Sequence, residues 1–217
     1  METPPHKPLT MRDLWRELVD ELFSLDRGLP WTFVQLWRRP GATIRGYVAA
    51  RDPRVTRPIR YLVIATAALT GAMLLLRSRF EAMGRIESGT QAAAIADLAI
   101  ENLLLVSAVG VVASALVMWL VFRRERPTLV ETTVVAAYIG AQSTWLNVVS
   151  GFAVAAAGSP WTSVLVAIVI IGYTVWAWGD YFGGRTRDWL RALAGIVLTQ
   201  AVTGALVFAA ARLATAG

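Results

Sequence analysis

The stretch SLDRGLPWTFVQLWRRPGATIRGYVAARDPRVTRPIRY, from Ser24 to Tyr61, decides how the rest of the chain is arranged. It carries eight arginines against two aspartates, Asp26 and Asp52, and it runs directly into the first long apolar segment. Arginine-rich segments beside membrane-spanning helices remain on the cytoplasmic side of the membrane. We therefore expect a basic platform at the cytoplasmic surface, followed by a membrane domain.

The composition limits the classes of protein to which this chain can belong. Of its 217 residues, 56% are hydrophobic and 17% are charged, whereas about 25% of the residues in soluble domains are charged. Residues 61–217 are too apolar and too unbroken for a water-soluble fold, so the bilayer is the expected solvent. The chain has no cysteine, and His6 is its only histidine. Because haem, iron–sulfur and structural zinc sites need sets of such ligands, we expect no metal site and no cofactor.

Residues 1–57 are predicted to form a cytoplasmic region of amphipathic helices. Within residues 10–23, apolar side chains recur at the i, i+3, i+4 spacing of a helix, and charges of both signs occupy its other face. Three roles are open to this predicted helix. It packs on the rest of its own chain, it lies in the membrane interface, or it docks a partner helix. A second helix starts near Pro30, which suits a first helical turn, and residues 38–41 end it. A third short helix covers residues 42–50.

Residues 58–217 are predicted to form the transmembrane domain, so the expected fold class is all-α and polytopic. Five segments are long and apolar enough to cross the bilayer: residues 59–76, 102–122, 132–157, 161–178 and 190–211. Residues 91–101 either extend the second span outward or lie on the outer surface. With the N-terminus inside, 17 of the 21 Lys and Arg residues lie on the inner side. This asymmetry predicts a multi-pass membrane protein with a cytoplasmic N-terminus and a C-terminus on the opposite side of the membrane.

The third predicted span, residues 132–157, is the most polar of the five. Glu131 and Gln142 share one helical face, and Asn147 lies on the adjacent face. An ionisable group inside a membrane is costly and usually functional, so Glu131 is a candidate proton or cation site. Alternatively, Glu131 lies at the inner boundary and pairs with arginines there, while the amides join neighbouring helices by hydrogen bonds. Gln200 of the fifth span is expected to meet Gln142 and Asn147 near the middle of the bilayer, where they line a path or hold helices together.

Five arginines form a candidate contact surface for anionic lipid headgroups or a protein partner: Arg39, Arg45, Arg51, Arg54 and Arg60. Guanidinium groups bind phosphates through two parallel hydrogen bonds, and cations beside apolar spans are attracted to anionic lipids. The alternative is that these arginines are ordinary inner-side charges that pair with Asp26, Asp52 and the inner loops. Nucleic-acid binding is not expected, because the chain shows no recognition motif.

The stretch from residue 24 to residue 61 resembles a family of bacterial membrane proteins known only as a domain of unknown function. The family pattern runs L-D-R-G, T-x-x-x-L, R-P-G-x-x-I-x-x-Y, R-x-x-R and N-P-[LI]-R-[YF]-L. The matching residues are Leu25-Asp26-Arg27-Gly28, Thr32, Leu36, Arg39-Pro40-Gly41, Ile44, Tyr47, Arg51, Arg54, Pro58, Arg60 and Tyr61. Many family members begin with a Cys-rich zinc ribbon, and these 217 residues contain no cysteine to build one. The resemblance implies a multi-pass protein of the bacterial inner membrane, whose C-terminus is then periplasmic, and no known activity.

The chain shows none of the standard catalytic signatures. It contains no G-x-x-x-x-G-K-[ST] phosphate loop, no G-x-S-x-G elbow and no H-E-x-x-H motif. The leading interpretation is therefore an accessory or scaffold subunit without enzymatic chemistry, whose Arg-rich cytoplasmic face and N-terminal helices contact lipids or a partner protein. The alternative is a small transporter or lipid-handling protein that uses the polar residues of the third span and Gln200.

Overall fold

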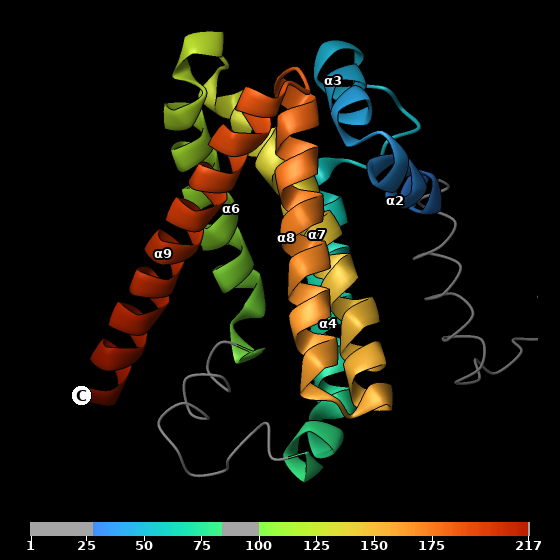
Figure 1. Cartoon of the computed structure of the whole chain (residues 1–217), viewed down its shortest axis with the longest axis vertical. Helices are drawn as coiled ribbons and strands as arrows, with labels where there is room; N and C mark the ends of the chain where they lie inside the picture. The colour runs from blue at the N-terminus through green and yellow to red at the C-terminus, as the bar shows by residue number, and fades with distance from the viewer. Residues whose placement is uncertain (1–27, 84–99, 217) are drawn as a thin grey trace, which may run out of the picture.

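In the computed structural model, which describes residues 28–83 and 100–216, all regular secondary structure is helical (Figure 1). Two short helices, α2 (Gly28–Arg38) and α3 (Pro40–Ala50), precede five long ones. The long helices are α4 (Pro58–Ala82), α6 (Leu103–Val121), α7 (Leu129–Ala157), α8 (Pro160–Phe182) and α9 (Thr186–Ala216). The all-α prediction is confirmed for this part of the chain. The helix predicted over residues 10–23 lies outside the described residues, as do residues 84–99.

Four of the long helices are long and apolar enough to cross a membrane: α4, α6, α8 from Trp161, and α9 as far as Leu206. They coincide with four of the predicted spans and are compatible with an integral membrane protein. Helix α7 coincides with the remaining predicted span and, with 29 residues, is about 43 Å long. It contains no span-length stretch as apolar as those of the other four, because amide and hydroxyl side chains interrupt its middle. Its crossing of the membrane stays a prediction.

The first predicted span ends earlier than the helix that contains it. The apolar run stops at residue 76, but α4 continues to Ala82. In this last part, Arg77 Nε donates to Glu81 Oε1 at 3.0 Å, one turn further along the helix. Such exposed pairs stabilise a helix by about 0.2–0.5 kcal/mol. The apolar run thus ends at residue 76, whereas the helix continues through the charged residues that follow it.

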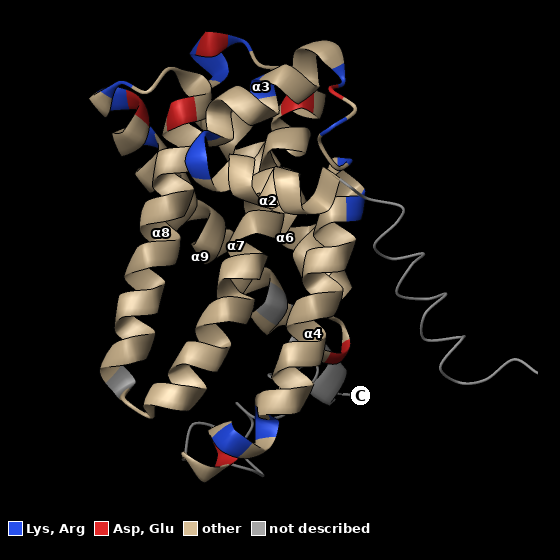
Figure 2. Ribbon diagram, turned by 90° about the vertical axis from the view of Figure 1, so that its right-hand side faces the viewer, with Lys and Arg blue, Asp and Glu red and all other residues tan. Residues whose placement is uncertain are grey.

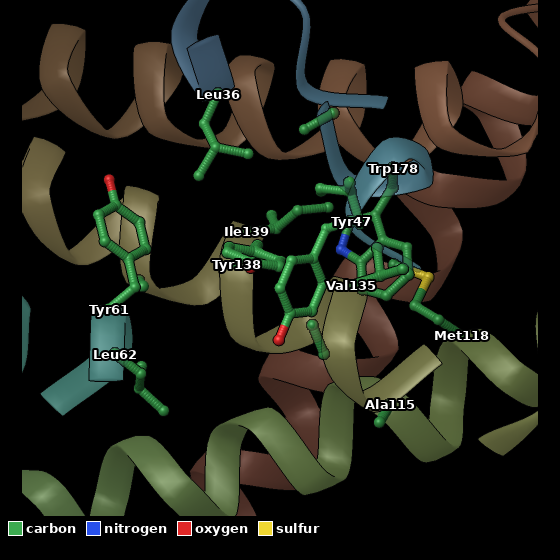
Figure 3. Close-up of a cluster of buried hydrophobic side chains, with 14 of the residues drawn as sticks. Leu36, Tyr47, Tyr61, Leu62, Ala115, Met118, Val135, Tyr138, Ile139 and Trp178 are labelled. Atoms are coloured by element: carbon green, nitrogen blue, oxygen red, sulfur yellow. The ribbon is translucent and has the colours of Figure 1, made fainter. Parts of the chain in front are cut away.

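Helix α7 lies at the centre of the structure and contacts α2, α3, α4, α6 and α8. Its residues Val135, Tyr138 and Ile139 are almost fully buried. Figure 3 shows them among buried side chains from all five of these helices: Leu36, Tyr47, Tyr61, Met118 and Trp178. In a bilayer, helices associate through close packing and polar contacts rather than through the hydrophobic effect. The central position of α7 therefore explains why this helix carries both the small and the polar residues.

Charged residues gather at the two ends of the helical bundle and leave its middle apolar. Figure 2 shows Lys and Arg residues concentrated around α3 and the start of α4, with a smaller group at the far end of α4. Between the ends, the surface exposes large apolar side chains such as Leu75, Leu165 and Phe208. The C-terminus lies at the end opposite to α3 (Figure 1). An apolar band between two charged ends is the pattern expected of a protein that spans a bilayer.

Two connections close the end of the bundle where α3 lies. A 3-10 turn, η1 (Arg123–Glu125), follows α6, and Glu125 Oε1 accepts a hydrogen bond from Arg191 Nη1 of α9 at 2.7 Å. The connection between α8 and α9 passes through Gly183 and Gly184, whose φ angles are 136° and 72°. Glycine adopts such angles without steric cost. These two residues therefore form the turn that lets α9 follow α8.

Candidate functional site

Helix α3 is docked on the C-terminal end of α8 by polar contacts. The Gly41 N–H donates to Asp180 Oδ2 at 2.8 Å, and a Cβ on Gly41 would lie 2.6 Å from the Asp180 backbone. Arg45 Nη1 donates to the carbonyl oxygens of Asp180 and Tyr181, at 2.6 and 2.8 Å. These carbonyls belong to the last turn of α8, where intrahelical donors run out. Residues 39–41 lie where α2 ends, as the sequence predicts. They also begin α3 and, through Gly41, contact α8.

One buried amide joins α2, α4 and α7. Gln142 of α7 is 0% exposed. Its Nε2 donates to the Phe33 carbonyl oxygen at 3.4 Å, and its Oε1 accepts a hydrogen bond from the Tyr61 hydroxyl. Unpaired polar groups away from water are costly, so these bonds hold the three helices in one arrangement. Gln142 therefore makes hydrogen bonds between helices, which is one of the two roles that the sequence predicts for it.

Further buried hydrogen bonds attach α2 and the connection after α3 to the bundle. The Tyr138 hydroxyl of α7 donates to the Thr56 carbonyl oxygen at 2.7 Å, and the Thr56 N–H donates to Thr32 Oγ1 at 2.8 Å. The Tyr173 hydroxyl of α8 donates to the Leu36 carbonyl oxygen at 3.2 Å. Residues 28–57, which belong to the predicted cytoplasmic region, consequently pack directly on the long helices.

A cavity of about 270 Å³ lies between α4, α6, α7, α8 and α9. Its polar lining consists of hydroxyl and amide side chains, among them Ser107, Ser114, Ser143, Asn147, Thr199 and Gln200. Asn147 Nδ2 donates to the Ser143 carbonyl oxygen at 2.9 Å, and the Ser143 hydroxyl lies 3.2 Å from that of Thr174. None of the described residues that line this cavity is charged. Such a lining suits water or a small neutral solute better than an ion.

The structure brings together two of the four residues predicted to form an intramembrane polar site. Asn147 and Gln200 line the same cavity. Gln142 faces α2 and α4 instead, where its Nε2 and Oε1 each make one hydrogen bond to another helix. Glu131 lies three turns before Gln142, about 16 Å away along α7. The predicted site is therefore divided between a cavity, a helix joint and a helix end.

Glu131 forms a capping box at the start of α7. Its N–H donates to Thr128 Oγ1 at 3.1 Å, and its carboxylate accepts a hydrogen bond from the Thr128 N–H at 2.9 Å. Both bonds satisfy backbone donors that the first turn of a helix leaves free. The sequence signal for this role is the T-x-x-E spacing of Thr128 and Glu131, which is typical of a capping box.

Arg45 and Arg54, both members of the predicted contact surface, make polar contacts within the chain. Arg45 binds the last carbonyls of α8. Arg54 Nη2 lies 3.0 Å from Asp52 Oδ2, and hydrogen bonds from Arg54 lower the pKa of the Asp52 carboxyl below its usual value. Because the folded-state pKa is lowered, this contact is fully present above the ordinary aspartate pKa and is lost as the pH falls through the lowered one. The pair lies at the surface, so its contribution to stability is small.

The other arginines lie at or near a large groove at the basic end of the bundle. Its volume is about 1230 Å³, and it separates the end of α3 from the starts of α4 and α7. We call it the basic groove, lined by Arg51, Arg57 and Arg60 and by Ile59, Val130 and Val134. Arg51 and Arg60 belong to the predicted contact surface, and Arg57 is a member that the sequence analysis misses. Arg39 is exposed at the start of α3, outside the groove.

No family model matches the chain, and no curated protein and no solved structure is significantly similar to it. The family resemblance of residues 24–61 therefore stays a prediction.

Proposed function

We propose that this protein is a multi-pass protein of the bacterial inner membrane that performs no chemistry of its own and acts as an accessory or scaffold subunit. The observation that supports this most directly is the docking of α2 and α3 through Gly41, Arg45 and Gln142. Held in this way, the two helices offer a preformed surface at the basic end of the bundle. A preformed surface binds a partner without a large ordering cost.

The distribution of charge supports a cytoplasmic position for this surface. Cations of α2, α3, η1 and the start of α9 lie at one end of the bundle, and the positive-inside rule assigns that end to the cytoplasm. Helix α7 then crosses the bilayer as the fifth span, with its polar side chains turned toward neighbouring helices. An odd number of crossings leaves the C-terminus in the periplasm.

Binding of a protein partner is expected to depend on Arg38 and Arg39, which are exposed where α2 meets α3. The variant Arg38→Gln/Arg39→Gln removes two charges without touching the docking contacts of α3. Extraction in native lipid discs followed by mass spectrometry should find a stoichiometric protein partner with the wild type and a loss of that partner from this variant. The matched control is Arg123→Gln/Arg124→Gln, which removes two exposed charges from η1 and should keep the partner. A partner retained by both variants, or discs without any second protein, would contradict the proposal.

The polar cavity favours a second candidate function, that of a carrier for small neutral solutes. Thr203 Oγ1 is buried beside this cavity and has no hydrogen-bond partner among the described residues. A bound water or solute would satisfy this hydroxyl. The disc experiment separates the two functions, because discs that retain a small polar molecule in place of a protein would favour the carrier.

A further inference from the structure

The basic groove lies where three helices of the bundle meet at its charged end. The end of α3 contributes Arg51, the start of α4 contributes Arg57 and Ile59, and the start of α7 contributes Val130. Figure 2 shows the basic residues that gather where α3 meets the start of α4. With a volume of about 1230 Å³, the groove is far larger than a water site and large enough for a lipid headgroup.

One side of the groove is cationic. Arg51 and Arg57 are both exposed there, and the Arg51 guanidinium lies 5.4 Å from the centroid of the Tyr47 ring, which holds it beside the groove. Asp52 also lines the groove, but its carboxylate lies 3.0 Å from Arg54 and forms an ion pair with it. Helix α4 begins at the groove, and its N-cap residue Arg57 supplies no capping side chain. The positive end of the α4 dipole therefore adds to the attraction for an anion.

Another part of the groove lining is apolar and exposed. Ile59 is 75% exposed and Val130 is 70% exposed, although both are large hydrophobic residues. Val134 and Ala137 continue the same wall along α7. A ligand that fills this groove therefore needs an anionic group at one end and an apolar body at the other.

We propose that the basic groove binds one anionic phospholipid, with its phosphate at Arg51 and Arg57 and an acyl chain along Ile59 and Val130. This inference rests on the proposed membrane setting and names the lipid contact of the basic face. It also changes the set of arginines involved, because Arg45 and Arg54 are engaged by α8 and by Asp52. Guanidinium groups suit a phosphate because they donate two parallel hydrogen bonds.

The test uses the full-length protein in discs of phosphatidylcholine containing phosphatidylglycerol, with native mass spectrometry to count the retained lipids. The wild type is expected to retain one phosphatidylglycerol molecule, and Arg51→Gln/Arg57→Gln should weaken this binding about thirtyfold. The control Arg185→Gln/Arg187→Gln removes two exposed cations from the same end of the bundle, outside the groove, and should bind as the wild type does. Equal retention by the two double variants would overturn the proposal.

A second variant tests the apolar side without removing a cation. Val130→Asp places a negative charge in the groove, and an acidic residue in the first turn of α7 is favourable for the helix. This variant should fold normally and lose the bound phosphatidylglycerol.

Displacement of the lipid by excess inorganic phosphate would instead show a site for the free anion. Cross-linking of Val130→Cys to Leu18→Cys would show that the N-terminal segment of the chain fills the groove. Either result would overturn the proposal.

These outcomes are separable from those of the proposed function. Phosphatidylglycerol is present in both leaflets of the discs, so its retention does not depend on the orientation of the protein or on a protein partner. Loss of the lipid site would leave the accessory role intact, and loss of the partner would leave the lipid site intact.

Discussion

Replacement of Gly41 by valine is expected to remove most of the folded protein. A Cβ at this position would lie 2.6 Å from both the carbonyl carbon and Oδ2 of Asp180, so α3 must move away from α8. That movement also breaks the hydrogen bonds of Gly41 and Arg45 to α8. Overpacking costs about 1–3 kcal/mol and each lost hydrogen bond about 1 kcal/mol, so the expected loss is about 3–5 kcal/mol. Many domains have little more stability than this.

The measurement is the yield of monodisperse protein in detergent, together with the midpoint of its thermal unfolding. The matched control is Gly46→Ala in the same helix, because no heavy atom lies within 4 Å of the added Cβ. Alanine favours a helix over glycine by up to about 1 kcal/mol, so this control should be as stable as the wild type or more stable. A Gly41→Val protein that unfolds at the wild-type temperature would show that α3 does not depend on its contact with α8.

The substitution Gln142→Leu is expected to destabilise the protein by about 2–4 kcal/mol. Leucine has a similar size, but it leaves the Tyr61 hydroxyl and the Phe33 carbonyl oxygen without the partner that both have in the wild type. Each buried polar group without a partner costs about 1–3 kcal/mol. Tyr61→Phe added to Gln142→Leu should restore part of the stability, because it removes the hydroxyl that Gln142→Leu leaves without its partner.

Gln200→Leu is the control for this prediction, because it makes the same change in an exposed amide that lines the polar cavity. Its effect on stability should stay within about 0.5 kcal/mol. Thermal unfolding of both variants in the same detergent compares them directly. Equal losses for the two variants would contradict a joining role that belongs to Gln142 and not to Gln200.

The helices of this protein are largely predictable from its sequence. The apolar runs correctly indicate α4, α6, α8 and α9, because side chains that face lipid must be apolar over the whole length of a span. Pro30 and the Arg39-Pro40-Gly41 segment correctly indicate two short helices with a break between them. The helix ends are less predictable, because charged pairs such as Arg77 and Glu81 continue a helix beyond its apolar run.

The contacts of the candidate site are much less predictable. Helical spacing places Gln142 and Asn147 on different faces of α7, but it does not say which neighbour each face meets. In the structure, the face that carries Gln142 meets α2 and α4, and the face that carries Asn147 lines the cavity. Arg45 likewise meets Asp180 only through the tertiary fold, since 135 residues separate them in the chain. The capping role of Glu131, in contrast, can be predicted from its T-x-x-E spacing to Thr128, which is typical of a capping box.

Cysteine accessibility tests most directly whether the protein crosses the membrane five times with its basic end in the cytoplasm. The chain has no cysteine, so single cysteines at the exposed positions Ala49, Ser78 and Arg187 report without background. On intact bacterial cells, an impermeant thiol reagent should label Ser78→Cys alone, and permeabilised cells should allow labelling of all three. Labelling of Ala49→Cys on intact cells would reverse the orientation. Labelling of Arg187→Cys together with Ser78→Cys would show that α7 does not cross the membrane.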